Sequence, residues 1–369
     1  MLRGDAEAAR RVWGIVLTAL IGVACAALVS LGNPGNMGIC GACFLRDIAG
    51  SLGFMAGKGP ACFRPEVVGV ILGALALTLF RSRFVARSGS HAVSRFVLGF
   101  WMALAALVFL GCPFRMLQRL GGGDLNAWAA LPGFVMGVYG ALLLERRGYS
   151  IGSTSPVPAP VGILGPLGAL GLLGLFLLPG HRLLGPGPGG LEKPPHAPWL
   201  WALGISLAAG AILSATGFCA VSSARQVFQQ KKAMLVAALA LIGGYAAVSV
   251  ATGRFHLGFS GQPIAHGELL WNSLALALLG LTGALAGGCP VRQLVMVGEG
   301  NGDAFVTVCG ILAGGAVAHT LGMVAIPAAA GVAGSVPMAG RIAVVIGLLV
   351  SGLYGCSMVW RGAPGRTKS

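Results

Sequence analysis

Long apolar runs separated by short polar turns make up most of this chain. A helix rises about 1.5 Å per residue, so about 20 apolar residues cross the hydrocarbon core of a bilayer. By that rule the pattern predicts ten spans, at residues 13–32, 66–81, 95–111, 127–144, 161–179, 198–215, 233–252, 269–287, 304–326 and 341–360. The sequence therefore predicts an all-α integral membrane protein with about ten transmembrane helices.

Four short segments interrupt this scheme, at residues 35–50, 111–124, 215–228 and 288–303. Each is too short and too polar to span a bilayer, and each is rich in Gly, Cys and Arg. Irregular backbone is stable at membrane depth only when it is buried in protein or lines a water-filled cavity. We therefore expect four short broken or re-entrant helices, with ordinary surface loops as the alternative.

The four segments match in pairs. "GCPFR" at 111–115 returns as "GCPVR" at 288–292, 177 positions later, and the segments at 35–50 and 215–228 match at an offset of 179. Asp124 and Asp303 each precede an apolar run and are predicted to be N-caps. Five spans separate equivalent points of the two copies, and this odd number predicts an inverted repeat, an architecture frequent in transporters.

The repeat divides the chain into five parts. We expect a cytoplasmic N-terminal segment at 1–12, a first repeat at 13–144, a linker with one extra span at 145–197, a second, inverted repeat at 198–326, and a last span with a basic cytoplasmic tail at 327–369.

Composition and charge agree with a membrane location. The chain is 56% hydrophobic and 9% charged, whereas about a quarter of the residues in a soluble domain are charged. Nothing resembles a nucleic-acid-binding module, so the net charge of +15 is interpreted as membrane topology plus attraction for anions. Basic turns near 81–95, 146–147 and 231–232 alternate with poorly basic linkers near 180–197, 253–268 and 327–340, which predicts that both termini are cytoplasmic.

The doubled Gly-Cys-Pro-x-Arg motif suggests a site. Proline is favoured at the first position of a helix, which places Cys112 and Cys289 at helix N-caps. The positive end of the helix dipole attracts anions and favours a thiolate. Arg115 and Arg292 lie one turn further along, and an arginine within the membrane indicates function by default. The alternative is that these cysteines only pack and the arginines extend to headgroups.

The other two segments contain related residues. "CGAC" places Cys40 and Cys43 in a Cys-x-x-Cys motif, which is compatible with a redox pair, metal ligands or a thiol pair on a helix. The second copy retains Cys219 but has Ser222 in place of the second cysteine, which is weak evidence for a metal site. Candidate path residues are therefore Cys40, Cys43, Cys112, Cys219 and Cys289, and candidate anion-attracting residues are Arg46, Arg115, Arg225 and Arg292. An ion pair between Arg46 and Asp47 that only holds the segment together is the alternative for the first arginine.

Several stretches resemble the YedE-type selenium transporters of the YeeE/YedE family, which includes bacterial thiosulfate uptake proteins. They are "GNPGNMGICGACFLRDIAGSLG", "RFVLGFWMALAALVFLGCPFRMLQRLGGGDLNA", "GQPIAH" with "LWN", and "GGCPVRQLVMVGEGNGD". The resemblance implies a multi-pass protein of the bacterial inner membrane that imports a selenium- or sulfur-containing solute along a path of cysteines. It also implies a cytoplasmic sulfur or selenium carrier protein as a partner. The segment "TGFCAVSSARQ" departs from the selenium-type pattern, which has an arginine before the cysteine and an acidic residue after the later arginine.

Three classes of function stay open at this point. The favoured one is an importer of a selenium compound or, next, a thiosulfate-like anion, without enzymatic activity and without a cofactor. A membrane thiol-disulfide oxidoreductase would use Cys40 and Cys43 as its redox pair. A carrier of soft metal ions would use the thiolates as ligands, although intramembrane arginines disfavour cations.

Overall fold

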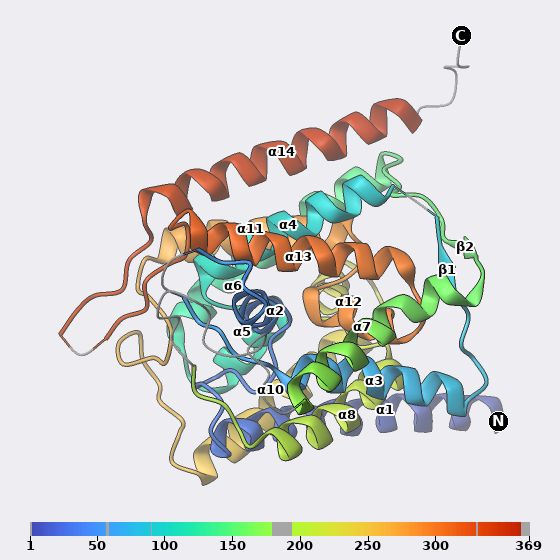
Figure 1. Ribbon diagram of the computed structural model, residues 1–369, viewed down its shortest axis with the longest axis horizontal. Coiled ribbons are helices and arrows are strands. Elements are labelled where there is room, and N and C mark those ends of the chain that lie inside the picture. The colour runs from blue at the N-terminus through green and yellow to red at the C-terminus, as the bar shows by residue number, and fades with distance from the viewer. Residues whose placement is uncertain (1, 57–58, 90, 179–193, 330, 363–369) are drawn as a thin grey trace.

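The computed structural model describes residues 2–56, 59–89, 91–178, 194–329 and 331–362, and it is almost entirely helical (Figure 1). The long helices are α1 (Leu2–Ser30), α3 (Pro65–Phe80), α4 (Ala92–Phe109), α6 (Leu125–Arg146), α7 (Ala159–Leu177), α8 (Trp199–Thr216), α10 (Ala233–Ala251), α11 (Leu269–Leu285), α13 (Gly302–Thr320) and α14 (Met338–Gly362). Two short strands, β1 (Arg87–Ser88) and β2 (Ser155–Pro156), pair antiparallel.

Each of the four polar segments contains a short helix. These are α2 (Gly41–Ser51), α5 (Pro113–Gly121), α9 (Ala220–Arg225), which continues into the 3₁₀ turn η1 (Gln226–Phe228), and α12 (Pro290–Gly298). The helices α5 and α12 continue apolar stretches that begin with α4 and α11, and each combined stretch is 30 residues long. The polar segments therefore contain short helices and not only loops.

Nine helices of the described chain are long and apolar enough to cross a membrane, which makes this a multi-pass membrane protein. The span predicted at 66–81 corresponds to α3, which is apolar but has only 16 residues. Its length, about 24 Å at 1.5 Å per residue, is limited by Pro65 at its start and by the basic turn that begins at Arg81.

The long helices pack in pairs that combine the two halves of the sequence. Helix α1 packs against α10 and α3 against α8, while α4 packs against α13 and α6 against α11. If the halves are matched as the sequence repeat suggests, α1 corresponds to α8, α3 to α10, α4 to α11 and α6 to α13. The contact of α1 with α10 then corresponds to that of α8 with α3, and the contact of α4 with α13 to that of α11 with α6. Helix α14 lies at the edge of the bundle, against α11, α4 and α6 (Figure 1).

Small residues make this close pairing sterically feasible. Three Gly-x-x-x-Gly segments lie at helix contacts, at residues 69–73, 133–137 and 310–314. A Cβ atom on Gly73 would lie 2.0 Å from the carbonyl oxygen of Leu207, and one on Gly137 would lie 2.0 Å from that of Ala277. Backbones approach closely only where side chains are small, a common arrangement between helices in membranes. These glycines therefore explain how α3 contacts α8 and how α6 contacts α11.

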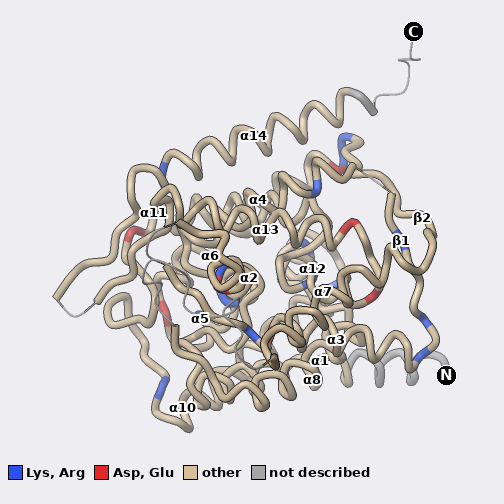
Figure 2. The backbone as a smooth tube through the Cα atoms, in the orientation of Figure 1, with Lys and Arg blue, Asp and Glu red and all other residues tan. Residues whose placement is uncertain are grey.

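The loops gather at two ends of the bundle. At one end, the backbone N–H of Arg87 donates to the carbonyl of Gly300 over 3.0 Å, close to β1 and β2. We call this end the inner face, because it includes the basic turns that the charge pattern predicts to be cytoplasmic. At the other end, the outer face, the N–H of Ala328 donates to the carbonyl of Ala265 over 2.8 Å. Charged residues are sparse along the long helices (Figure 2).

Some expectations concern residues outside the described part of the chain. These are the end of the basic tail, at 363–369, and most of the linker near 180–197. The backbone of the predicted N-terminal segment 1–12 is described from residue 2 onward, where it already belongs to α1.

Candidate functional site: four cysteine-capped helix ends

Each of the four short helices begins directly after a cysteine. The N-cap residues are Cys40 for α2, Cys112 for α5, Cys219 for α9 and Cys289 for α12, all with extended backbone conformations. Proline occupies the first helical position of α5 and α12, where its missing N–H costs no helical hydrogen bond. The predicted caps at Cys112 and Cys289 are confirmed, and the same position is occupied by cysteine in the other two helices.

The five candidate cysteines form two groups, one in each sequence repeat. In the first, the thiol of Cys40 donates to Sγ of Cys112 over 3.4 Å, and the backbone N–H of Cys43 donates to Sγ of Cys40 over 3.4 Å. In the second, the N–H of Cys289 donates to Sγ of Cys219 over 3.5 Å. All nine cysteines of the chain are unbonded thiols, and these five are at most 3% exposed.

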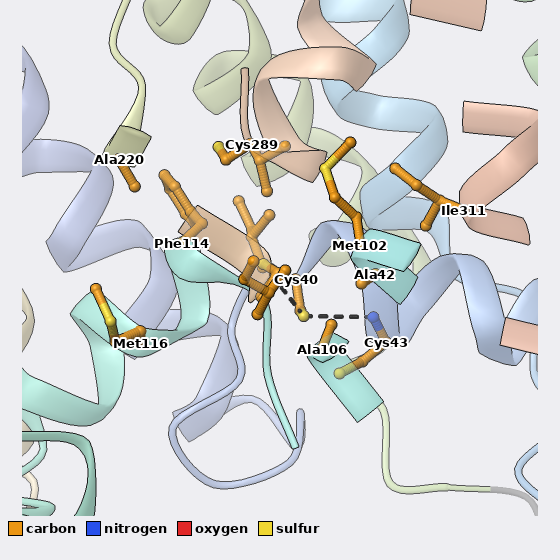
Figure 3. Close-up of a cluster of buried hydrophobic side chains, with 14 of the residues drawn as sticks. Cys40, Ala42, Cys43, Met102, Ala106, Phe114, Met116, Ala220, Cys289 and Ile311 are labelled. Carbon is orange, nitrogen blue, oxygen red and sulfur yellow. Dashed lines mark hydrogen bonds between the residues drawn. The ribbon is translucent and has the colours of Figure 1, made fainter. Parts of the chain in front are cut away.

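The two groups meet in the centre of the molecule. Helix α2 contacts α12, and α5 contacts α9. A Cβ atom on Gly41 would lie 2.7 Å from Cβ of Pro290, so the first turns of α2 and α12 are in direct contact. Figure 3 shows Cys40, Cys43 and Cys289 in one cluster of buried side chains with Phe114. The rings of Phe114 and Phe218 pack edge to face with centroids 6.3 Å apart.

This convergence gives the centre a positive electrostatic character. A helix N-terminus has unpaired N–H groups and a partial positive charge. Four such ends, from helices that run away from a common region, favour an anion, and the sulfur atoms add polarizable contacts for a soft atom. The arrangement is chemically suited to a small anion that contains both oxygen and a soft element.

Arg115 is a fully buried cation that is bound by carbonyl groups alone. Its Nε donates to the carbonyl of Asn36 over 3.1 Å, and its Nη2 donates to Gly35, Pro263 and Ile264 over 3.2–3.4 Å. Its Nη1 is buried without a hydrogen-bond partner, and no acidic side chain of the described residues forms an ion pair with it. The positive charge of Arg115 is therefore not neutralised locally.

Arg292, the counterpart of Arg115, has a different environment. Its two terminal nitrogens donate to the two carboxylate oxygens of Glu299, each over 3.1 Å. Glu299 also accepts from the hydroxyl of Ser214 over 2.9 Å and lies 3.5 Å from Arg87. Two arginines that match in sequence thus differ in charge balance, because only the second has a carboxylate.

The other two candidate arginines form ion pairs. Arg46 pairs with Asp47 over 2.6 Å, as the alternative interpretation predicted, and Asp47 also pairs with the fully buried Arg64 over 2.7 Å. Arg225 pairs with Glu145 at the end of α6. These contacts attach α2 and α9 to their neighbours, which is a structural role independent of any bound anion.

The two faces cover the central cysteines differently. On the outer face, Nε2–H of His266 donates to the carbonyl of Val108 over 2.8 Å, and burial lowers the pKa of His266, so its ring is neutral near pH 7. On the inner face, Tyr149 donates to the carbonyl of Leu285, the counterpart of Val108, over 3.1 Å. A cavity of 380 Å³ adjoins this contact, lined in part by Ser222, Arg225 and Glu145.

Two residues that hold the site were missed at the sequence level. The amide of Gln118 on α5 accepts from the N–H of Gly38 over 2.7 Å and donates to the carbonyl of Ile39 over 2.6 Å. These two hydrogen bonds hold the segment directly before Cys40. Gly41 permits the contact with Pro290. Gly41 lies inside the "CGAC" motif, so it could have been found, whereas nothing local marks Gln118.

One capping prediction is confirmed and one is wrong. Asp124 is the N-cap of α6 and accepts from the N–H of Asn126 over 2.9 Å. In the second repeat Asn301 is the cap of α13, and Asp303 lies in the first turn, where it pairs with Arg95 over 3.1 Å. Asn301 lies 177 positions after Asp124, the same offset as between the two Gly-Cys-Pro-x-Arg motifs, so Asp303 lies two positions past the counterpart of Asp124.

The chain matches no family model, and no curated protein is significantly similar to it in sequence.

Proposed function

We propose that this protein is a transmembrane importer of a small selenium- or sulfur-containing species, with a selenium compound first and a thiosulfate-like anion next. The observation that carries the proposal is the convergence of four helix N-termini, each capped by a buried cysteine. Helix ends and Arg115 provide favourable potential for charged oxygens, and thiols contact the soft atom. Weak contacts at several sites permit release as well as binding.

The proposal includes the inverted repeat. Its support is the exchange of roles in the helix contacts, in which α1 with α10 corresponds to α8 with α3. In this arrangement Cys40 and Cys112 belong to the outer half of the path, and Cys219 and Cys289 to the inner half. The chain resides in the bacterial inner membrane with both termini in the cytoplasm, as the basic turns favour. A cytoplasmic sulfur or selenium carrier would receive the solute.

Burial of the thiols argues against the second class of function. A thiol-disulfide oxidoreductase exchanges electrons with a partner through an accessible thiolate. Cys40 and Cys43 are 1% and 2% exposed, which leaves no access for a partner protein. In this proposal a transported solute reaches them by movement of α2 and α9, which ion pairs at Asp47 and Arg225 attach to their neighbours.

Uptake by purified protein in liposomes tests the proposal. Radiolabelled thiosulfate and selenite, and selenide under reducing conditions, are each added outside vesicles that contain only this protein. We expect saturable uptake of at least one of them, and strong loss of uptake in Cys40→Ser and Cys289→Ser. Cys356→Ser is the matched control, because Cys356 is exposed on α14. Absence of uptake by well-folded protein, or equal effects of all three substitutions, would overturn the proposal.

A further inference from the structure

A second concave site lies on the inner face, away from the central cysteines. It has a volume of 230 Å³ and is formed where α3 and α8 end, close to the C-terminal end of α12. Three arginines line it, Arg81, Arg83 and Arg87, together with Thr78 and Ser214. The cavity is therefore rich in hydrogen-bond donors that suit an oxyanion.

Positive charge exceeds negative charge around this cavity. Glu299 is the acidic residue in its lining, and its two oxygens already bind Arg292 and Ser214. Arg87 approaches Glu299 only to 3.5 Å, and its Nε is buried without a hydrogen-bond partner. Within the described part of the chain, the side chains of Arg81 and Arg83 form no hydrogen bond or ion pair. At least two guanidinium groups thus lack a counter-charge.

The rim of the cavity is apolar and faces the surroundings of the bundle. Leu77 and Val85 line the cavity, and Val85 is 50% exposed. Next to them, Leu79 and Phe80 at the end of α3 are 55% and 89% exposed. An exposed phenylalanine beside arginines fits the boundary between headgroups and acyl chains, where one end of a ligand is charged and the other is apolar.

We propose that this cavity binds a phosphate-type anion, and that its source in the membrane is the headgroup of an anionic phospholipid whose acyl chain lies along Leu79 and Phe80. Basic pockets between helices on the cytoplasmic side are physically suited to such headgroups. The inference does not depend on the transported solute, because it uses none of the candidate path residues.

Lipid binding to the purified full-length protein tests this proposal. The double variant Arg81→Gln/Arg83→Gln is compared with Arg146→Gln/Arg147→Gln, which removes two charges from the basic end of α6. Binding of fluorescent phosphatidylglycerol in detergent is measured, with phosphatidylcholine as the neutral lipid. A surface arginine contributes about fivefold to binding of an anionic headgroup, so we expect about 30-fold weaker binding in the first variant. The second variant should bind as the unchanged protein does.

Competition separates the two sources of the anion. Inorganic phosphate should displace the lipid only at millimolar concentration, because the free ion lacks the apolar contact. Displacement at micromolar concentration would retain the anion site but overturn the lipid assignment. Equal affinity of both double variants, or equal binding of the neutral lipid, would overturn the site altogether. A thermal-unfolding measurement in the same detergent checks that both variants are folded.

Discussion

The contact between α2 and α12 can be tested by adding one methyl group, in Gly41→Ala. The new Cβ would lie 2.7 Å from Cβ and from the carbonyl carbon of Pro290, and 2.7 Å from the backbone nitrogen of Val291. These are backbone and ring atoms, which cannot rotate away, so the cost should be near the upper end of the 1–3 kcal/mol typical of overpacking, about 3 kcal/mol. Alanine in place of glycine also increases stability by up to about 1 kcal/mol, because it restricts the unfolded chain. We expect a net loss of about 2 kcal/mol.

Thermal unfolding in detergent, followed by uptake in liposomes, measures this effect. Gly204→Ala on α8 is the control, since a Cβ there meets no atom within 4 Å. It should leave the melting temperature unchanged or raise it slightly. Gly41→Ala should unfold at a lower temperature and should also slow uptake, because the first turns beside Cys40 and Cys289 must separate. If Gly41→Ala is as stable and as active as the control, the two helix ends do not meet and the central site is wrongly placed.

Three further predictions concern the buried charges and the access of a reagent to the central cysteines from each face. Asp47→Asn leaves Arg46 and Arg64 without their carboxylate and should lower the free energy of unfolding by about 3–5 kcal/mol. Glu268→Gln breaks a part-exposed pair with Arg341 and should lower it by at most about 1 kcal/mol. Thermal unfolding measures both, and equal losses would contradict the buried network. Arg115→Lys keeps the charge but loses the planar guanidinium group that binds four carbonyls, so it should destabilise the protein by about 1–3 kcal/mol. Arg292→Lys should destabilise it less. The reverse order would show that the carbonyl contacts contribute little. A membrane-impermeant thiol reagent should label Cys289 in inside-out vesicles faster than Cys112 in right-side-out vesicles, because the cavity adjoins the inner group; faster labelling of Cys112, read by mass spectrometry, would contradict this.

The local features of the site were predictable because short-range rules govern them. Proline at the first helical position and glycine before the cysteine determine where α5 and α12 begin, independently of the rest of the fold. The repeat matched Cys112 with Cys289 and Cys40 with Cys219, whereas the hydrogen bonds join Cys40 to Cys112 and Cys219 to Cys289 within each repeat. Gly38 illustrates the limit of such matching. It aligns with Gly217, yet Gly38 is required because a Cβ would lie 2.0 Å from the carbonyl of Cys25, whereas Gly217 has a φ of +64°.

By itself, the sequence determined that this protein is helical, that it belongs in a membrane, and that two of its short helices begin directly after Cys112 and Cys289. These properties depend on hydrophobic length and on residues within one helical turn. Only the tertiary structure decided the electrostatics of the site. Arg115 meets carbonyls of a loop about 150 positions away, while Arg292 meets the carboxylate of Glu299. Matching residues acquire different partners because loop length and packing differ between the two halves. A local sequence pattern does not determine which distant residues pack against these arginines.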